Sequence, residues 1–468
     1  MAPSIPAAEL ISSKDHVVPG QLLVTEMFFQ VPRCYHDPSL GQILLFGRRA
    51  VKNENPRAPG QSDLEAETQK PYVVYLEGGP GFGNREPQDH PITRFFLGKG
   101  YQVLLLDHRG VGLSTPVSAD MLSSLGGADA QVEHLKAMRQ DNTVRDCEAV
   151  RKCLTEGWSE DKAKWSIFGQ SYGGFVSLSY LSLHPEGLSE VFLTGGLAPV
   201  GKTADQVYQA VFPRVISRNK GYYVKFPEDI DNVRRIAEYI EKRGGSVPLP
   251  AGGSLTVPRL MTLGIAFGFH GGFDQVHAVI LQLSASLDQF GFFTRSSLAA
   301  LETFTPFDTN IIYAVLHEAI YCDGPGYASR WASDRVARNF DAFNWLKSSS
   351  SVLASNEPLY FVGENIFPFH FETYPELIPL QEVAQKLADF DEWPALYNQE
   401  QLRRNEVPVY AASYVDDMFV DNNFARETAA LVKGTKVFET NVMYHTALRA
   451  KSDAVLQALF ALRDDVLD

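Results

Sequence analysis

Short apolar runs alternate with amphipathic helical stretches through the first 200 residues of the chain. Residues 73–76 and 103–106 are uninterrupted valine, leucine and tyrosine, which is typical of strands buried on both faces of a parallel sheet. A helical pattern over residues 143–156 is followed by further strand-like runs at 165–168 and 191–193. Strands that alternate with helices in this way predict a mainly parallel sheet with helices on both faces.

The pattern differs in three other parts of the chain. Residues 22–50 have the pattern of antiparallel strands that lead into the sheet. Residues 52–70 are polar and rich in proline, glycine, asparagine and glutamate, which predicts an exposed loop. From about residue 199 to residue 405 the apolar spacing is mostly helical and is interrupted by glycine and proline.

Strands and helices alternate again after this helical stretch. The expected elements are a strand at 407–412, a helix at 423–431, a strand at 436–438 and a final helix at 452–462. Because the sheet begins before the helical stretch and ends after it, the stretch is interpreted as an insertion. We therefore expect an α/β core domain of residues 1–199 and 406–468, and a mostly helical cap domain of residues 200–405 over the carboxyl ends of the strands.

The most informative motif is Gly169-Gln-Ser171-Tyr-Gly173, which lies between the run at 165–168 and a helical pattern. A serine on a sharp turn between a strand and a helix exposes its hydroxyl to a base and a substrate. Glycine two residues before and two residues after the serine removes the Cβ atoms that would crowd this turn. The flanking strand and helix favour this interpretation over an ordinary surface loop, so we expect Ser171 to be a nucleophile.

A serine nucleophile needs a base and a carboxylate, which in this kind of protein follow in the order Ser, Asp or Glu, His. His445 follows the last expected strand and precedes the closing helix, and we expect it to be the base. Asp416 and Asp417 follow the strand at 407–412. Because adjacent side chains point in different directions, only one of them can orient the base. We expect Asp417 to do so, with Asp416 as the alternative.

Acyl transfer by a serine also needs an oxyanion hole, because the tetrahedral intermediate carries negative charge on the former carbonyl oxygen. One donor is expected to be the amide of Tyr172, which directly follows the nucleophile. The other is expected to be Gly79, in the glycine-rich segment that follows the strand at 73–76. This segment lacks the Gly-x-Gly-x-x-Gly and Gly-Lys-Ser/Thr patterns, so nucleotide binding is not expected.

Composition narrows the classes of partner. The 468-residue chain is 45% hydrophobic, enough for a large core, and its formal net charge of −14 argues against nucleic acid and anionic membrane surfaces as partners. No apolar run approaches the ~20 residues of a membrane span, and no signal-peptide pattern or glycosylation sequon is present, so we expect a cytoplasmic protein. Cys34, Cys147, Cys153 and Cys322 lack metal-ligand spacing and are expected to be reduced thiols. No feature of the sequence indicates an oligomeric state.

Four motifs together resemble the proline iminopeptidases, or prolyl aminopeptidases, of the α/β-hydrolase superfamily. They are Gly78-Gly-Pro-Gly81, Asp107-His-Arg-Gly-Val-Gly-Leu-Ser114, Gly169-Gln-Ser-Tyr-Gly-Gly174 and Tyr444-His-Thr-Ala-Leu-Arg449. Each motif occurs in other hydrolases, but the set in this order is more restrictive. The resemblance implies an α/β-hydrolase fold and a serine exopeptidase that releases N-terminal proline through an acyl-enzyme, with no metal or cofactor.

The resemblance also implies that acidic residues of the cap hold the free amino end of the peptide substrate. A buried ammonium is costly unless it is paired with a carboxylate. The candidates are Glu318 and Glu364, which both lie among aromatic residues in the sequence. Phe267, Phe269 and Phe273 are candidates for the pocket of the proline ring, although an aromatic stripe also suits an ordinary core.

The chain departs from the family pattern in two respects. Glu77 stands where related sequences often carry His or Gln, and its charge would oppose the oxyanion unless it is paired or points away. The insertion is longer than in compact members, which leaves the preference for the leaving residue open. Arg109, in the second motif, is expected to form a structural ion pair rather than to take part in catalysis.

Other functions remain compatible with the same residues. An esterase, an amidase or a broader aminopeptidase could use this fold, because the cap distinguishes these chemistries. A non-catalytic α/β-hydrolase-like binding protein is a rival from a different class. The presence of Ser171, Asp417 and His445 in the expected order argues against that rival, because a protein that has lost catalysis has no need to keep all three residues.

Overall fold

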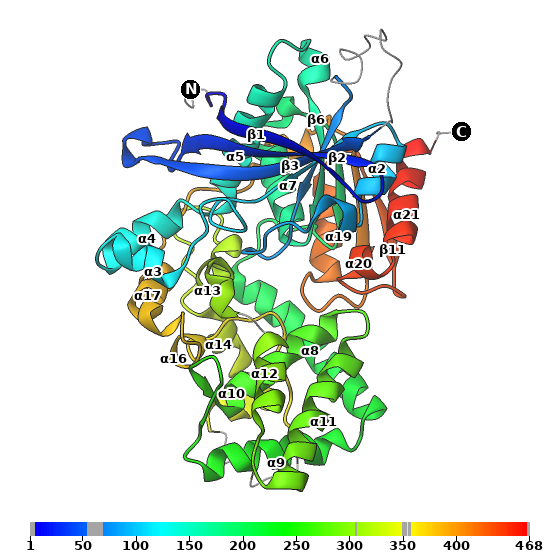
Figure 1. Ribbon diagram of the computed structural model, residues 1–468. Helices are drawn as coiled ribbons and strands as arrows, with labels where there is room; N and C mark the ends of the chain where they lie inside the picture. The colour runs from blue at the N-terminus through cyan, green and yellow to red at the C-terminus, as the bar shows by residue number, and fades with distance from the viewer. Residues whose placement is uncertain (1–4, 54–68, 305–306, 349–352, 354–356, 466–468) are drawn as a thin grey trace.

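The computed structural model describes residues 5–53, 69–304, 307–348, 353 and 357–465. A nine-stranded sheet forms its centre, with the strand order β1-β2-β3-β5-β4-β6-β7-β10-β11 (Figure 1). The strands are β1 Glu9–Val18, β2 Leu22–Pro32, β3 Gln42–Lys52, β4 Tyr72–Leu76, β5 Gln102–Leu106, β6 Trp165–Gln170, β7 Leu188–Thr194, β10 Val409–Tyr414 and β11 Thr435–Thr440. The first three are antiparallel, and the six from β5 to β11 run parallel to one another. The expectation of a mainly parallel sheet is confirmed.

Every residue of β4 and β5 is buried, and alternate side chains of each strand enter different cores. Val74 and Leu76 pack on one face with helices α5 (Gln140–Leu154) and α7 (Tyr172–Leu183). Val73 and Tyr75 pack on the other face with helices α2 (Thr93–Gly98) and α21 (Ser452–Asp464). This two-sided burial explains why these strands are continuous apolar runs in the sequence. The helices of this part of the chain are α2 Thr93–Gly98, α3 Ala119–Ser124, α4 Ala128–Lys136, α5 Gln140–Leu154, α6 Glu160–Ala163, α7 Tyr172–Leu183, α19 Asn422–Leu431, α20 Ala447–Ala450 and α21 Ser452–Asp464.

The expected strands and helices are present, with shifted ends, and one strand of the nine-stranded sheet was not expected. β10 begins two residues after the expected position 407 and continues to Tyr414, two residues before Asp416. The unexpected strand is β1, whose side chains are mostly exposed on both faces, so it has no alternation of apolar and polar residues. The loop expected at 52–70 lies, apart from its ends, outside the described residues.

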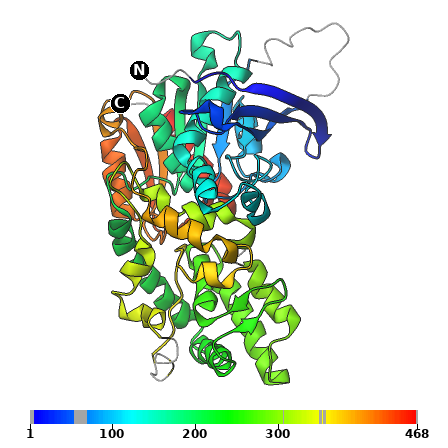
Figure 2. The same cartoon turned by 90° about the vertical axis from the view of Figure 1, so that its left-hand side faces the viewer.

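The chain between β7 and β10 is mostly helical, as expected. Its helices are α8 Ala204–Lys225, α9 Asp229–Lys242, α10 Val257–Met261, α11 Gly272–Phe290, α12 Arg295–Phe304, α13 Ile311–Leu316, α14 Ala332–Ala337, α16 His370–Thr373, α17 Gln381–Asp389 and α18 Gln399–Arg403. A small hairpin of β8 Val247–Pro248 and β9 Ser254–Leu255 interrupts them. In Figure 1 the sheet occupies the upper half and α8 to α12 form a lobe below it, and Figure 2 shows the same separation after a quarter turn.

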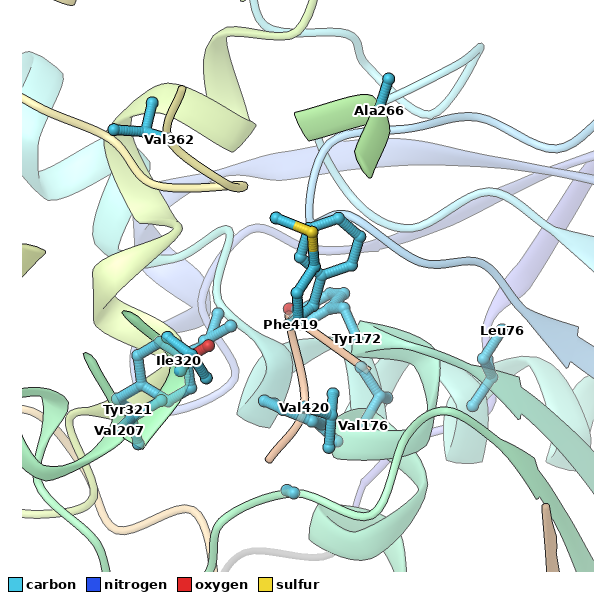
Figure 3. Packing of buried hydrophobic residues seen from close by; sticks show 14 of the residues in the cluster. Leu76, Tyr172, Val176, Val207, Ala266, Ile320, Tyr321, Val362, Phe419 and Val420 are labelled. Carbon is cyan, nitrogen blue, oxygen red and sulfur yellow. The ribbon is translucent and has the colours of Figure 1, made fainter. Parts of the chain in front are cut away.

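One apolar core continues from the sheet into the inserted segment. Leu76, Tyr172 and Val176, from β4 and α7, belong to the same buried cluster as Ile320 and Tyr321 of the insertion (Figure 3). Because burial of apolar surface stabilises the folded state by about 25 cal/mol per Å², this shared core fixes the insertion against the sheet. The four cysteines are free thiols. Among the described helices, none combines the length and the apolar character that crossing a lipid bilayer requires.

Candidate active site

Ser171 lies on a strained turn between β6 and α7. Its backbone has φ +54° and ψ −123°, a combination that is rare for any residue other than glycine. A Cβ on Gly169 would lie 2.4 Å from the Gly173 carbonyl oxygen, and a Cβ on Gly173 would lie 1.9 Å from the carbonyl oxygen of Leu76. The two glycines of the motif are therefore required by the close approach of the backbone at this turn.

The structure brings Ser171, His445 and Asp417 together. His445 Nε2 lies 2.8 Å from Ser171 Oγ, and His445 Nδ1 lies 2.7 Å from Asp417 Oδ2. His445 and Asp417 are each only 4% exposed, while Ser171 is partly exposed. The three side chains follow β6, β11 and β10, at the carboxyl edge of the sheet. This geometry lets the imidazole accept a proton from the serine while the carboxylate holds its other nitrogen.

Asp417, rather than Asp416, faces the imidazole. Asp417 Oδ1 accepts hydrogen bonds from the amides of Phe419 at 2.9 Å and Val420 at 3.2 Å, which leaves Oδ2 directed at His445. The Asp416 side chain is 38% exposed and pairs instead with Arg214 at 2.8 Å. The two adjacent carboxylates thus point in different directions.

The environment of His445 sets its protonation. Burial lowers the pKa of the imidazole. The charge and hydrogen bond of Asp417, and then the charge of Glu364, raise the pKa by more than burial lowers it, so that the pKa lies above its ordinary value. The Phe419 ring packs edge-on against the imidazole, with 4.8 Å between ring centres. A base must be neutral to accept a proton, so activity through His445 is expected to fall as the pH drops through this raised pKa.

The two expected oxyanion donors lie beside Ser171. Gly79 and Ser171 line the same cavity, and a Cβ on Gly78 would lie 3.1 Å from Ser171 Cβ, so this turn passes directly beside the serine. Gly79 has φ +121°, which favours glycine. Tyr172 begins α7, where backbone amides have no partner within the helix. The role of both amides stays a prediction.

The charge of Glu77 beside the oxyanion turn is paired. Its buried carboxylate accepts a hydrogen bond from the Gly78 amide at 2.8 Å and forms an ion pair with Arg449 at 3.3 Å. Arg449 belongs to the same motif as His445, and both line the cavity. The departure of Glu77 from the family pattern therefore comes with a neutralising partner.

The Asp107-His-Arg-Gly segment is structural. Arg109 pairs with the buried Asp146 through Nε at 2.7 Å and Nη2 at 2.5 Å, in agreement with the expected ion pair. Asp107 accepts hydrogen bonds from the amides of Asn84 at 2.7 Å and Leu113 at 3.0 Å. Asp107 thereby connects the loop at Asn84, which follows the Gly79 turn, to the loop at Leu113.

A cavity of about 290 Å³ opens above Ser171. Its volume is at the lower end of the range of ligand pockets, about 300–1,000 Å³. It is lined by Glu77, Gly78, Gly79, Phe82, Gly83, Arg85, Gln170, Ser171, Ile265, Phe269, Tyr313, Glu364, Phe419, His445, Thr446 and Arg449. Of the three candidate phenylalanines, Phe269 is in this lining, whereas Phe267 and Phe273 pack against Tyr222 in the core.

The two candidate carboxylates lie in different places. Glu364 lines the cavity with Ser171 and His445, and burial raises its pKa to about 8 against the lowering effect of His445. Glu318 does not line this cavity. Its carboxylate oxygens accept hydrogen bonds from the amides of Ala332 at 3.2 Å and Ser333 at 2.8 Å, at the start of α14. The structure therefore brings Glu364, but not Glu318, to the reacting side chains.

Several lining residues were not expected from the sequence. Phe82 and Phe419 belong to segments that were identified for their neighbours, Gly79 and Asp417, and could have been found by extending those segments. Ile265 and Tyr313 come from the insertion, where no motif marks them. The described residues contain no group of three or more His, Cys, Asp or Glu side chains placed to hold a metal ion.

The sheet order and the strained serine turn define an α/β-hydrolase, and a model of the alpha/beta hydrolase fold matches residues 71–222. The chain belongs to the proline iminopeptidase family, so the resemblance drawn from the four motifs is confirmed. It is 38% identical to a proline iminopeptidase of Aspergillus aculeatus over 465 residues, which cover 99% of each chain. It is 37% identical to a proline iminopeptidase of Aeromonas sobria over 460 residues, which cover 97% of this chain and 100% of the relative.

Proposed function

We propose that the protein is a serine exopeptidase that releases N-terminal proline from peptides with a free amino end. The observation that carries this proposal is a single small cavity that contains the hydroxyl of Ser171, the imidazole of His445 and the carboxylate of Glu364. Membership of the proline iminopeptidase family supports the same substrate class.

In the proposed mechanism, His445 accepts the proton of Ser171 as the serine oxygen attacks the carbonyl carbon of the first residue. Asp417 orients the imidazole and stabilises the imidazolium. The amides of Gly79 and Tyr172 bind the oxyanion. His445 then donates its proton to the leaving amine, the acyl-enzyme forms, and His445 activates the water that hydrolyses it.

Glu364 is the proposed anchor for the substrate ammonium. Glu364 is half-buried, and desolvation raises the pKa of its carboxyl group to about 8, so an adjacent cation would favour the ionised form. Glu318 lies outside the lining of this cavity, and burial raises the pKa of its carboxyl group as well.

Residues 200–405 are proposed to act as a cap domain on a core of residues 1–199 and 406–468. Ile265, Phe269, Tyr313 and Glu364 from this segment complete the cavity over Ser171. A small cavity bordered by the insertion suits an enzyme that accepts only the end of a peptide. The free cysteines fit a reducing compartment such as the cytoplasm.

A panel of substrates tests this function against its alternatives. The purified protein is expected to hydrolyse proline 2-naphthylamide with a kcat/KM at least tenfold higher than alanine and leucine 2-naphthylamides, because a shaped apolar pocket typically discriminates by ~10–200-fold. Release of naphthylamine is followed by fluorescence, with p-nitrophenyl acetate as the ester. Ester turnover without amide turnover would favour an esterase. Equal rates on the three amides would favour a broader aminopeptidase, and no turnover of any substrate would favour a binding protein.

Substitution of Glu364 by glutamine tests the ammonium anchor. We expect kcat/KM for proline 2-naphthylamide to fall about 100-fold, because removing one partner of a desolvated charge pair typically costs about 2–5 kcal/mol. Turnover of p-nitrophenyl acetate, which has no ammonium, should change less than about threefold. Glu318→Gln is expected to have a smaller effect, and the exposed Glu382→Gln is the matched control. Equal losses on both substrates would rule out the anchor role.

A further inference from the structure

One residue of the insertion contacts both chain neighbours of His445. His270 lies between the 3₁₀ segment Thr262–Gly268 and α11. Its Nε2 accepts a hydrogen bond from the Tyr444 amide at 3.0 Å, and its own amide donates to Thr446 Oγ1 at 3.1 Å. The residues immediately before and after the base are therefore both bonded to His270.

Arg218 of α8 contacts the same loop. Its guanidinium carbon lies 4.3 Å from the ring centre of Tyr444 and 4.3 Å from the ring centre of Phe273, so the cation is held between two aromatic faces. Arg218 Nε also donates to the Phe267 carbonyl at 2.9 Å. A cation placed over aromatic rings in this way is attracted by their negative faces. Arg218 thus links the Tyr444 ring to the aromatic core of the insertion.

The hydrogen bond from Tyr444 requires an unprotonated Nε2 on His270. Burial lowers the pKa of this imidazole, and the positive charges of Lys451 and Arg218 lower it further. His270 is therefore neutral at neutral pH and able to accept the bond. Its ring also packs on the Tyr444 ring, with 5.1 Å between centres.

The loop that carries His445 is anchored to the core through the buried Met443, and its tip is exposed. It lies between β11 and the short helix α20, and its residue Val442 is 64% exposed. The imidazole must nevertheless keep its distances of 2.8 Å to Ser171 and 2.7 Å to Asp417 at the same time. Because a displacement of about 1 Å can cost ~10²-fold in rate, contacts that fix this loop bear directly on catalysis.

We propose that His270 and Arg218 are positioning residues for the catalytic base, so that the insertion fixes His445 as well as enclosing the substrate. This inference rests on the role of His445 in the proposed function. Arg214, one helical turn before Arg218 on α8, makes a related contact with Asp416 at 2.8 Å. That ion pair is more than a third exposed at both ends, and such pairs contribute little.

The test compares variants that remove or keep the acceptor. His270→Phe keeps an aromatic ring but cannot accept the Tyr444 hydrogen bond, whereas His270→Gln retains an acceptor oxygen at a similar reach. For proline 2-naphthylamide we expect His270→Phe to lower kcat about tenfold with KM changed less than threefold, and His270→Gln to recover kcat to within about threefold of the wild type. Arg218→Met, which keeps the side-chain stem without its charge, should also lower kcat, and Arg218→Lys should lower it less.

A low-field proton NMR signal from the hydrogen bond between His445 and Asp417 gives a readout that does not need turnover. We expect this signal to weaken in His270→Phe and to return in His270→Gln. The matched control is His277→Phe, which changes a histidine of the same insertion whose described contacts are with Phe226 and Asp229. Its kcat and signal should match the wild type.

Two results would overturn the positioning role. One is a wild-type kcat and signal in both His270→Phe and Arg218→Met. The other is a loss of kcat and signal in His277→Phe equal to the loss in His270→Phe, together with no recovery in His270→Gln. That result would indicate general weakening of the insertion. If the wild-type protein releases no proline, the proposed function fails, and the NMR comparison still decides whether His270 and Arg218 hold the base.

Discussion

Replacing Ser171 with alanine is expected to lower kcat for proline 2-naphthylamide by about 10⁶-fold. This is the size of the effect when the nucleophile of a serine peptidase is removed while its other groups remain. Ser171 is the one hydroxyl at hydrogen-bond distance from His445 Nε2 in the described structure. The fold should be retained, because alanine is smaller and the flanking glycines keep the turn open.

The measurement requires purified protein whose substitution is verified by mass spectrometry, with thermal unfolding followed in parallel. Ser182→Ala is the matched control, because Ser182 lies at the far end of the same helix and its hydroxyl bonds to the Leu178 carbonyl. This control should keep wild-type kcat. Substantial activity in folded Ser171→Ala would show that another group is the nucleophile.

The second large effect is expected for Asp417→Asn, with a loss in kcat of about 10⁴-fold. An asparagine amide can donate to His445 Nδ1, which favours the tautomer that carries its proton on Nε2 and cannot accept the proton of Ser171. The amide oxygen can still accept from Phe419 and Val420, so the loop should keep its shape. Asp416→Asn, whose side chain faces Arg214, is expected to lose less than about tenfold.

The pH profile provides an independent check of the same pair of variants. Although burial lowers the pKa of His445, the charge of Asp417 is the first of the groups that raise it. Removing that charge should therefore move the acidic limb of kcat/KM to lower pH in Asp417→Asn and leave it in place in Asp416→Asn. The reverse order of the two variants, in rate or in profile, would assign the role to Asp416.

The parts of the fold that are buried on both faces could be predicted from the sequence. Residues 73–76 and 103–106 are continuous apolar runs because both faces of β4 and β5 are covered. β1 could not be predicted in this way, because it is an edge strand with solvent on both faces and its order comes from pairing with β2. Tertiary pairing of this kind leaves no hydrophobic pattern in the sequence.

Within the site too, residues fixed by local sequence could be predicted, and contacts between distant segments could not. Ser171 and His445 could be predicted because a turn geometry and a chain order constrain them locally. The separation of Glu318 from Glu364 could not be predicted, because it depends on hydrogen bonds from the first amides of α14 to the Glu318 carboxylate. The ion pair between Glu77 and Arg449 joins residues far apart in the sequence, and no local sequence pattern predicts it.

The small cavity above Ser171 also limits which substrates the protein can accept. A cavity of about 290 Å³, bordered by residues of the insertion, lies at the lower end of the size range of ligand pockets. A cavity of this size suits the end of a peptide better than a segment in the middle of a folded chain. Such selection by size would restrict cleavage to the ends of chains and spare internal peptide bonds.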